Sequence, residues 1–420
     1  MSLHWFKKPE NLLALSLAAL ILILHFVIID QVHSQMFDEQ HYVKAANRFL
    51  DGESMGNVEH PPLGKLLIAL GIWAFGDEPF GWRFFPILFG AASIILFYLI
   101  CQNLTARKWV PLLAVFLFAF DNNHFAQSHV AMLEEFVVTL MLAAFLLYLR
   151  GKYIGAGAMV ALGTLVKLTG VLAIIPILLH WFFVRRGEWR EGLKLIISAA
   201  VVFLALLPPL ELLALHKFHW PWERLSEMYR LLSSITFSGS HHEAMSHPWE
   251  WVIKFWEPMW FWYKPAYQGC PNYTLGALII PIMAFGTYRA LRRSSNPLPR
   301  LLNRGGYPSP SGTSEPPLWG LPAVRGNSLC LFALGWFAAT YLSLILSDLV
   351  SDRIMFKFYF YPSIGALYMI LSLALSQIWH LSSNFRYGGA WAIRGLVIAF
   401  LLGHLAVFAI MSPYTSIVSR

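Results

Sequence analysis

Two adjacent carboxylates, Asp38 and Glu39, lie shortly after an apolar run of the chain, Leu12 to Ile29. Carboxylates at a membrane surface are costly unless they are solvated or have a function. Partial burial raises the pKa of such a group and can turn it into a general base. The ordinary alternative is a solvated pair, or one that caps the helix expected near Tyr42. The neighbouring His41 and a second polar cluster downstream favour the functional interpretation.

That second cluster lies in the same connection, at His60, Pro61, Pro62 and Lys65. The two prolines stiffen the turn, because each fixes its own φ angle. Lys65 can then place a cation near the carboxylates. Together the two clusters predict a polar site in the connection that follows the first apolar run.

The composition predicts a polytopic membrane protein. Hydrophobic residues make up 57% of the 420 residues and charged residues only 13%, which is more apolar surface than a soluble protein of this length needs. The net charge of +8 comes largely from Lys and Arg in short connections, so it does not favour nucleic-acid binding. The three cysteines, which are Cys101, Cys270 and Cys330, suggest neither a disulfide framework nor a metal site.

About eleven apolar segments are long enough to be candidate spans. They lie near residues 11–30, 82–101, 109–125, 130–149, 153–167, 169–184, 195–213, 272–290, 328–347, 355–377 and 393–412. Two long connections between them, 31–81 and 214–271, contain apolar or Trp-rich segments typical of structured loops at headgroup level. We therefore expect an all-α fold with two structured outer loops.

Basic residues predict the orientation. With the N-terminus in the cytoplasm, the connections on that side carry Lys7, Lys8, Arg107, Lys108, Arg150, Lys152, Arg185, Arg186, Arg190, Arg289, Arg292, Arg293, Arg300, Arg304, Arg325 and Arg386, and the opposite side is poorer in basic residues for its length. Loops 31–81 and 214–271 then lie outside the cytoplasm, as does the C-terminus.

We predict a catalytic transmembrane module over 1–291, a flexible cytoplasmic linker over 292–327, and C-terminal transmembrane helices over 328–420.

The stretch from Phe37 to Tyr42 resembles the first outer loop of the protein O-mannosyltransferase family, which uses polyprenyl-phosphate sugars and has the GT-C fold. Further motifs similar to the family follow in the same order: Gly81-Trp82-Arg83, Phe120-Asp121-Asn122, Met132-Leu133-Glu134, the turn around Lys167, His247-Pro248-Trp249, Trp260-Phe261-Trp262-Tyr263 and Arg353-Ile354-Met355-Phe356. Loop 214–271 is too short for the sugar-binding repeats of the eukaryotic members, so the chain resembles the bacterial form. Two positions depart from the family pattern, His129 in place of Arg and Glu134 in place of Asp.

The resemblance implies an inverting transfer of a sugar, by similarity mannose, to Ser or Thr hydroxyls of exported proteins. Asp38 would be the base, and Glu39 would help to hold acceptor or donor. The resemblance also implies two further groups of residues. The donor phosphate would be bound by Arg353, Lys357, Lys167 and His129, and other parts of the substrates by His60, Lys65, Arg83, Asp121, Glu134 and His247. We expect Arg353 and Lys357 to share one face of a helix.

Other classes of protein remain open at this stage. The acceptor could be a lipid or glycan, as in the related lipid A aminoarabinose transferases, or Asp38, Asp121 and Glu134 could form the proton path of a secondary transporter. The sequence motifs call for no cofactor besides the lipid-linked sugar, which is the donor. They do not indicate whether the reaction needs a divalent cation. His247 follows His242 by five positions, where the helical zinc motif needs four, so we expect no metal site. The expected partners are the donor lipid, an exported protein and membrane lipid, at the plasma (inner) membrane with an extracytoplasmic site.

Thiol labelling tests this orientation. Cysteines introduced in loops 31–81 and 214–271 should react with an impermeant thiol reagent added to intact cells, because donor and acceptor must meet on that side. Cysteines in place of Arg186 and Gly305 should stay unlabelled until the cells are opened. Labelling of the two long loops from opposite sides would contradict a single site that both loops share.

Overall fold

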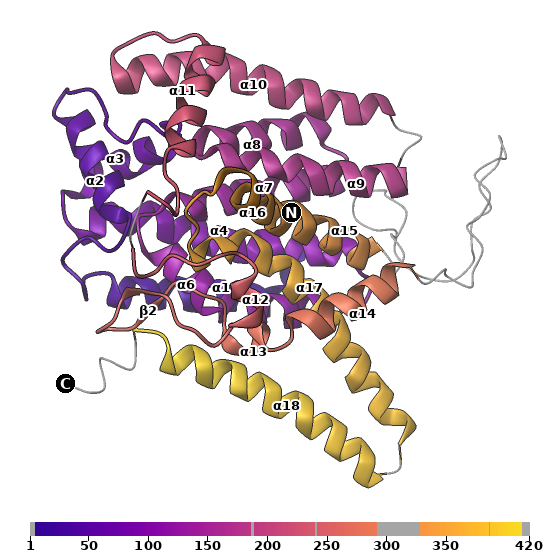
Figure 1. The fold of residues 1–420 in the computed structure, drawn as a ribbon. Helices are drawn as coiled ribbons and strands as arrows, with labels where there is room; N and C mark the ends of the chain where they lie inside the picture. The colour runs from indigo at the N-terminus through magenta and orange to yellow at the C-terminus, as the bar shows by residue number, and fades with distance from the viewer. Residues whose placement is uncertain (1–4, 186–188, 240–241, 292–327, 386, 414–420) are drawn as a thin grey trace.

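The computed structural model describes residues 5–185, 189–239, 242–291, 328–385 and 387–413 (Figure 1). Over these residues the protein is mainly helical, with one small antiparallel sheet of β1 (Trp260–Trp262) and β2 (Tyr267–Gln268). The α-helices are α1 (Pro9–Ile28), α2 (Glu39–Leu50), α3 (Leu63–Phe75), α4 (Pro79–Leu104), α5 (Trp109–Ala119), α6 (Asn122–His129), α7 (Leu133–Leu149), α8 (Tyr153–Val166), α9 (Ile174–Arg185), α10 (Trp189–Leu215), α11 (Pro221–Ser233), α12 (Glu250–Ile253), α13 (Tyr273–Gly276), α14 (Ile279–Leu291), α15 (Ser328–Phe337), α16 (Ser343–Ser351), α17 (Tyr361–Leu381) and α18 (Tyr387–Ile410). Short 3-10 segments, η2 (Leu168–Ala173) and η5 (Lys357–Phe360), precede α9 and α17.

Several helices are long and apolar enough to cross a membrane. In the described ranges, six helices have the length and the apolar composition needed to cross a membrane. The bent pair of α6 and α7 makes a seventh span if the two helices are counted as one span. Five shorter apolar helices accompany them. The prediction of an all-α, multi-pass membrane protein is confirmed, while the count of eleven stays a prediction.

The span expected at 109–125 is interrupted, which corrects the sequence-based boundary. Helix α5 ends at Ala119, and the carboxylate of Asp121 accepts the N–H groups of Asn123 and His124. This cap starts the new helix α6, because it satisfies N–H groups that would otherwise lack partners. α6 and α7 then meet at 110°. Such a break at membrane depth is tolerated only where it is buried in protein, and every residue from Asn122 to His129 is buried.

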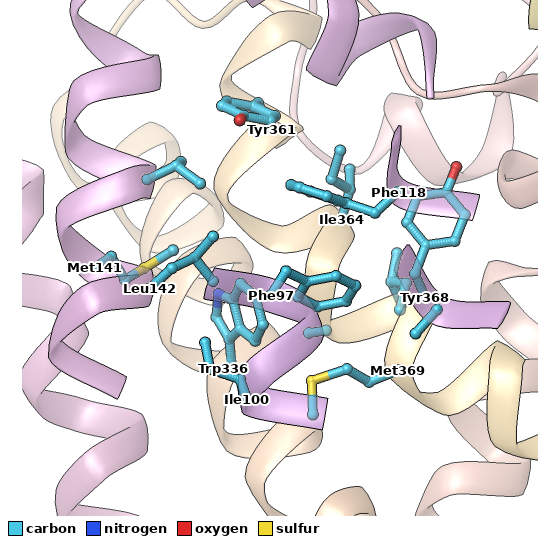
Figure 2. Packing of buried hydrophobic residues seen from close by; sticks show 14 of the residues in the cluster. Phe97, Ile100, Phe118, Met141, Leu142, Trp336, Tyr361, Ile364, Tyr368 and Met369 are labelled. Atoms are coloured by element: carbon cyan, nitrogen blue, oxygen red, sulfur yellow. The ribbon is translucent and has the colours of Figure 1, made fainter. Parts of the chain in front are cut away.

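Helix α17 lies at the centre of the bundle, although it belongs to the C-terminal part of the chain. Figure 2 shows Tyr361, Ile364, Tyr368 and Met369 of α17 near Phe97 of α4, and Trp336 of α15 beside them. One hydrophobic cluster thus contains residues that precede position 292 in the chain and residues that follow position 327. The predicted domain division stays a prediction, and the linker itself lies outside the described residues.

The two long connections are structured, as expected. The first holds α2 and α3, close to the two helices that the sequence predicts there, and α2 is amphipathic. The second holds α11, α12 and the sheet. Figure 1 shows α10 and α18 along opposite edges of the bundle, with α2 and α3 together at one end. Asp38 lies at that end, directly before α2.

Candidate active site

The backbone at Phe37 sets the position of Asp38. Phe37 has a left-handed conformation, with φ of 49°, which costs of order 1–3 kcal/mol for a bulky residue. Four rings surround its side chain at centroid distances of 5.3 to 5.7 Å, and they belong to His242, Phe261, Phe356 and Phe358. This packing offsets the strain, so the turn before Asp38 is held by the second outer loop and by the segment leading into α17.

Glu39 and Arg83 form a buried ion pair at the base of the same loop. Both side chains are fully buried, and the guanidinium donates two hydrogen bonds to the carboxylate, at 3.1 and 3.0 Å. A guanidinium has five N–H donors. The remaining three donate to the carbonyls of Ile29, Val32 and Ser34. Arg83 therefore fixes the chain that leads from α1 to Asp38.

The Glu39 carboxylate reaches two further segments. It accepts the backbone N–H of Met36 at 2.9 Å and that of Ala131, in the break between α6 and α7, at 3.0 Å. From the sequence, Glu39 is expected to help hold acceptor or donor, and Arg83 either to contact substrate or, slightly favoured, to pair with the loop carboxylates. The structure shows this pairing, and every donor of Arg83 and both oxygens of Glu39 are used inside the protein. We assign the pair to positioning.

Lys167 and Glu134 form a second buried ion pair, at 2.5 Å. Lys167 comes from the turn between α8 and η2, and Glu134 from the first turn of α7. The ammonium of Lys167 also lies over the ring of Tyr359, 4.8 Å from its centroid. The sequence resemblance placed Lys167 with the donor phosphate, and the structure places it on the wall of a pocket.

That pocket, which we call the Lys167 pocket, has a volume of about 150 Å³. Its polar lining combines Lys167 and Glu134 with Arg353, from the segment before η5, and with Tyr359. Hydroxyl groups of Thr169, Thr340, Ser343 and Ser347 line it too, and its apolar wall consists of Val137, Met141, Leu172, Leu344, Met355 and Pro362. Two cations therefore face one cavity that is otherwise largely apolar.

Asp38 lies within electrostatic reach of this pocket. Burial, with the negative charge of Glu134 added, raises the pKa of Asp38 to about 7, and the charge of Lys167 offsets part of the rise. No hydrogen-bond partner of its carboxylate appears among the described residues. A carboxylate with a pKa near neutrality is suited to accept a proton, because it is basic and still substantially ionised.

His60 and Lys65 lie beside this site. His60 is buried, and burial together with the charges of Lys167, Lys65 and Arg353 lowers its pKa well below its usual range. It therefore stays neutral. Lys65 donates to the carbonyls of Asn57 and His60, so it shapes the loop behind the Pro-Pro turn. His60 and Lys65 therefore lie together, as the sequence predicts. The ammonium of Lys65 is bound to backbone carbonyls, and its contact with substrate stays a prediction.

Two predicted phosphate ligands lie elsewhere. Residues 353–356 are not helical and form isolated β-bridges at Arg353 and Phe356, so Lys357 does not share a helix face with Arg353. Lys357 donates to the carbonyls of Lys254 and Glu257 and holds the second outer loop. His129 is fully buried and its Nδ1 lies 3.1 Å from Nδ1 of His25. Neither residue lines the Lys167 pocket, and their contact with the donor phosphate stays a prediction.

Asp121 and His247 also have partners of their own. Besides capping α6, Asp121 accepts the backbone N–H of Asn272 and the hydroxyl of Tyr368, so its role is structural. His247 contacts Asp348 at 2.9 Å and stacks on Trp249. It lies at the partly exposed rim of the second outer loop, and its contact with substrate stays a prediction.

Sequence reasoning missed Tyr359 and Glu135. Tyr359 lines the Lys167 pocket. It lies in η5, a short 3-10 turn, so helical periodicity in the sequence could not indicate which way its side chain faces. Glu135 accepts hydrogen bonds from Ser128, Thr139 and Tyr361. In the sequence, only its position next to Glu134 could have pointed to Glu135 as a residue of interest. In the described ranges, no group of three or more His, Cys, Asp or Glu side chains is arranged to hold a metal ion.

Comparison with solved structures defines the class. The fold is similar to a chain of the protein O-mannosyltransferase Pmt1–Pmt2 complex of S. cerevisiae, with a TM-score of 0.71 and 13% identity over 97% of this chain and 90% of that one. It is also similar to ArnT from Cupriavidus metallidurans, with a TM-score of 0.60 and 14% identity over 95% and 75% of the two chains. At these identities the likeness concerns the fold. The fold is that of the GT-C membrane glycosyltransferases.

Comparison of sequences then indicates a family. The model of the dolichyl-phosphate-mannose-protein mannosyltransferase family matches residues 15–220, just under half of the chain, and this segment is similar to that family. A polyprenol-phosphate-mannose–protein mannosyltransferase of Mycolicibacterium smegmatis is 34% identical over 136 residues. That match covers 31% of this chain and 26% of the relative's length.

The Arg83–Glu39 pair should dominate the stability of the first outer loop. Arg83→Met leaves the buried Glu39 carboxylate without its counter-charge and three carbonyls without their donor, and should cost about 3–5 kcal/mol. Glu39→Gln should cost a similar amount, and the double variant less than the sum of the two. Thermal unfolding of the purified variants in detergent measures these differences.

Arg48→Met provides the matched control. Arg48 pairs with Glu53 on the surface, where both side chains are exposed (45% and 61%), and such a pair contributes at most about 1 kcal/mol. Equal falls in melting temperature for Arg83→Met and Arg48→Met would refute the positioning role.

Proposed function

We propose that this protein transfers mannose from a polyprenyl-phosphate donor to Ser or Thr hydroxyls of exported proteins, with inversion at the sugar carbon. The observation that carries the proposal is Asp38, a carboxylate with a pKa of about 7, beside a pocket that combines Lys167 and Arg353 with an apolar wall. A base, a cationic phosphate site and a lipid-compatible surface are the three parts that this reaction needs.

The Lys167 pocket fits the leaving group. The donor's phosphate would lie between Lys167 and Arg353, which offer charge-assisted hydrogen bonds. Val137, Met141 and Leu172 offer apolar surface to the first isoprene units. Because the phosphate gains negative charge as its bond to the sugar breaks, preorganised cations stabilise the transition state more than the ground state.

Asp38 acts on the other side of the sugar. The acceptor hydroxyl gives its proton to the Asp38 carboxylate while its oxygen forms a bond to the anomeric carbon. The bond from that carbon to the phosphate oxygen breaks in the same step, and the lipid phosphate leaves with the electron pair. Attack from the face opposite the leaving group inverts the configuration. Glu134 assists indirectly, since its charge helps to raise the pKa of Asp38.

The protein acceptor is proposed from the sequence relatives. Curated relatives from mycobacteria and Corynebacterium carry the name polyprenol-phosphate-mannose–protein mannosyltransferase. The likeness to ArnT is one of fold and does not favour a lipid acceptor. The proton-coupled transporter is not favoured, because Asp121 accepts four hydrogen bonds and Glu134 is paired with Lys167.

The location of the reaction is also part of the proposal. Asp38 lies in the loop that follows the first span, and the distribution of Lys and Arg puts that loop outside the cytoplasm. We place the protein in the plasma (inner) membrane with its site facing outward. Lipid-linked mannose and an exported protein can both reach that surface. No further cofactor enters the mechanism.

Asp38→Asn tests the base. The amide cannot accept the acceptor's proton, so the transfer rate should fall about 10²–10⁴-fold, while the melting temperature stays near that of the wild type. In the wild type, the rate should rise about tenfold per pH unit below pH 7 and level off above it, because only the ionised carboxylate is active. The measurement is transfer of labelled mannose to an acceptor peptide in detergent. The exposed neighbour Asp30 provides the control variant, Asp30→Asn.

A flat pH profile from pH 5 to 8 would show that the rate does not depend on a group with the pKa of Asp38. Near-normal turnover of Asp38→Asn would remove Asp38 from the mechanism altogether.

Arg353→Ala tests the phosphate site. Loss of a charge-assisted contact of about 1.5–3 kcal/mol should lower kcat/KM for the donor by roughly ten- to a hundredfold. Arg353→Lys should recover part of it. Lys254→Ala is the control, since Lys254 forms an exposed pair with Glu250 away from the pocket. Rates against donor concentration, with melting curves alongside, separate binding from unfolding, and an unchanged donor dependence would exclude Arg353 from the site.

A further inference from the structure

A second cavity lies where the first helix begins, and neither the mechanism nor the comparisons assign it a role. Its volume is about 300 Å³, at the lower end of the range for small-molecule sites. The N-terminal end of α1, the C-terminal end of α4 and the connection to α5 form it. Its lining consists of Trp5, Lys8, Glu10, Asn11, Leu99, Gln102, Asn103, Thr105, Ala106, Arg107, Lys108, Pro111 and Arg150.

The floor of this cavity is a rigid polar network. Asn11 is fully buried and donates to the carbonyl of Trp5 at 2.7 Å. Its side-chain oxygen accepts from the hydroxyl of Tyr98 and from the amide of Gln102, both at 2.8 Å. These bonds tie α1 to α4, so the cavity is preformed and need not be assembled by a ligand.

The rim is cationic. Lys8, Arg107 and Lys108 are exposed, and none of them is paired with a carboxylate in the part of the chain that the structure describes. Arg150 contributes a fourth cation to the wall, and Glu10 is the only acidic residue of the lining. A preformed cavity with this excess of positive charge is suited to an anion, and Arg and Lys together are the usual ligands of phosphate.

Two exposed aromatic residues indicate the depth of the cavity in the membrane. Phe6 is 46% exposed and Trp109 is 66% exposed. In the sequence, Phe6 precedes Lys7 and Lys8, and Trp109 follows Lys108. Exposed aromatic residues at the ends of apolar helices are typical of the headgroup level. Helix α1 has 20 residues and therefore spans about 30 Å, which separates this cavity from Asp38 by the thickness of the hydrocarbon core.

We propose that this cavity binds the phosphate headgroup of an anionic phospholipid from the leaflet opposite the active site. The phosphate would contact Lys8, Arg107 and Lys108, and the acyl chains would lie beside α1 and α5. A free phosphate shares the same chemistry, but the cavity's place at headgroup level favours the lipid. Binding there ties α1 to α4 and α5 and so stabilises the helix that delivers Asp38.

Short-chain lipids provide the test. The full chain, purified in detergent, is titrated with dioctanoyl-phosphatidylglycerol, dioctanoyl-phosphatidylcholine or sodium phosphate at matched ionic strength. Bound lipid is counted by native mass spectrometry and the melting temperature is recorded. The phosphatidylglycerol should bind and raise the melting temperature of the wild type, while the other two should not. The double variant Arg107→Gln/Lys108→Gln should bind it about ten- to thirtyfold more weakly, as expected for the loss of two basic residues near an anionic lipid.

A matched variant, Lys152→Gln/Arg190→Gln, removes one Lys and one Arg that do not line the cavity. It should bind the phosphatidylglycerol as the wild type does. The proposal fails if this control loses as much affinity as the cavity variant, because the attraction would then be a general effect of charge. It also fails if the phosphatidylcholine binds equally well, or if phosphate alone gives the same rise in melting temperature.

Discussion

The buried ion pair of Arg83 and Glu39 is the interaction on which the active site depends. Two charges without solvent are stable only if every donor and acceptor is satisfied, and here the guanidinium uses all five of its N–H groups. The acceptors come from the segment between α1 and α2, and Glu39 also binds the break between α6 and α7 at Ala131. The pair therefore joins the loop of Asp38 to the part of the bundle that carries Glu134.

The site itself is a balance of charges in a small volume. Glu134 neutralises Lys167 and at the same time raises the pKa of Asp38. Arg353 then adds the positive charge that a phosphate would meet in the Lys167 pocket. In the proposed mechanism, Asp38 accepts a proton while the cations of the Lys167 pocket face the leaving group. The adjacent acidic residues then differ in role, because Asp38 has no hydrogen-bond partner among the described residues whereas Glu39 is bound to Arg83.

The sequence could predict part of the grouping of residues around this site, while their catalytic and binding roles stay predictions. Asp38, Lys167 and Arg353 were expected at the reaction centre from their motifs, and the structure places Asp38 within electrostatic reach of the pocket that the other two line. Lys357 was assigned there on the assumption of a helix, whereas the chain is extended before η5. The sequence favoured Arg83 as a partner of the loop carboxylates, but its spacing could not reveal that Glu39 is that partner or that three backbone carbonyls satisfy the remaining donors. The break at Asp121 was missed because an apolar run hides a cap that forms only when the chain folds.

The sequence alone determined the class of protein, since apolar segments of sufficient length must be shielded from water whatever their arrangement. It also determined that Asp38 follows the first span. Only the tertiary structure decided which cations share a cavity within electrostatic reach of that carboxylate. Lys167, Glu134 and Arg353 come from three distant parts of the chain, and they meet because α7, α8 and the segment before α17 pack together. Helical periodicity describes neighbours on one helix, and it carries no information about contacts between helices.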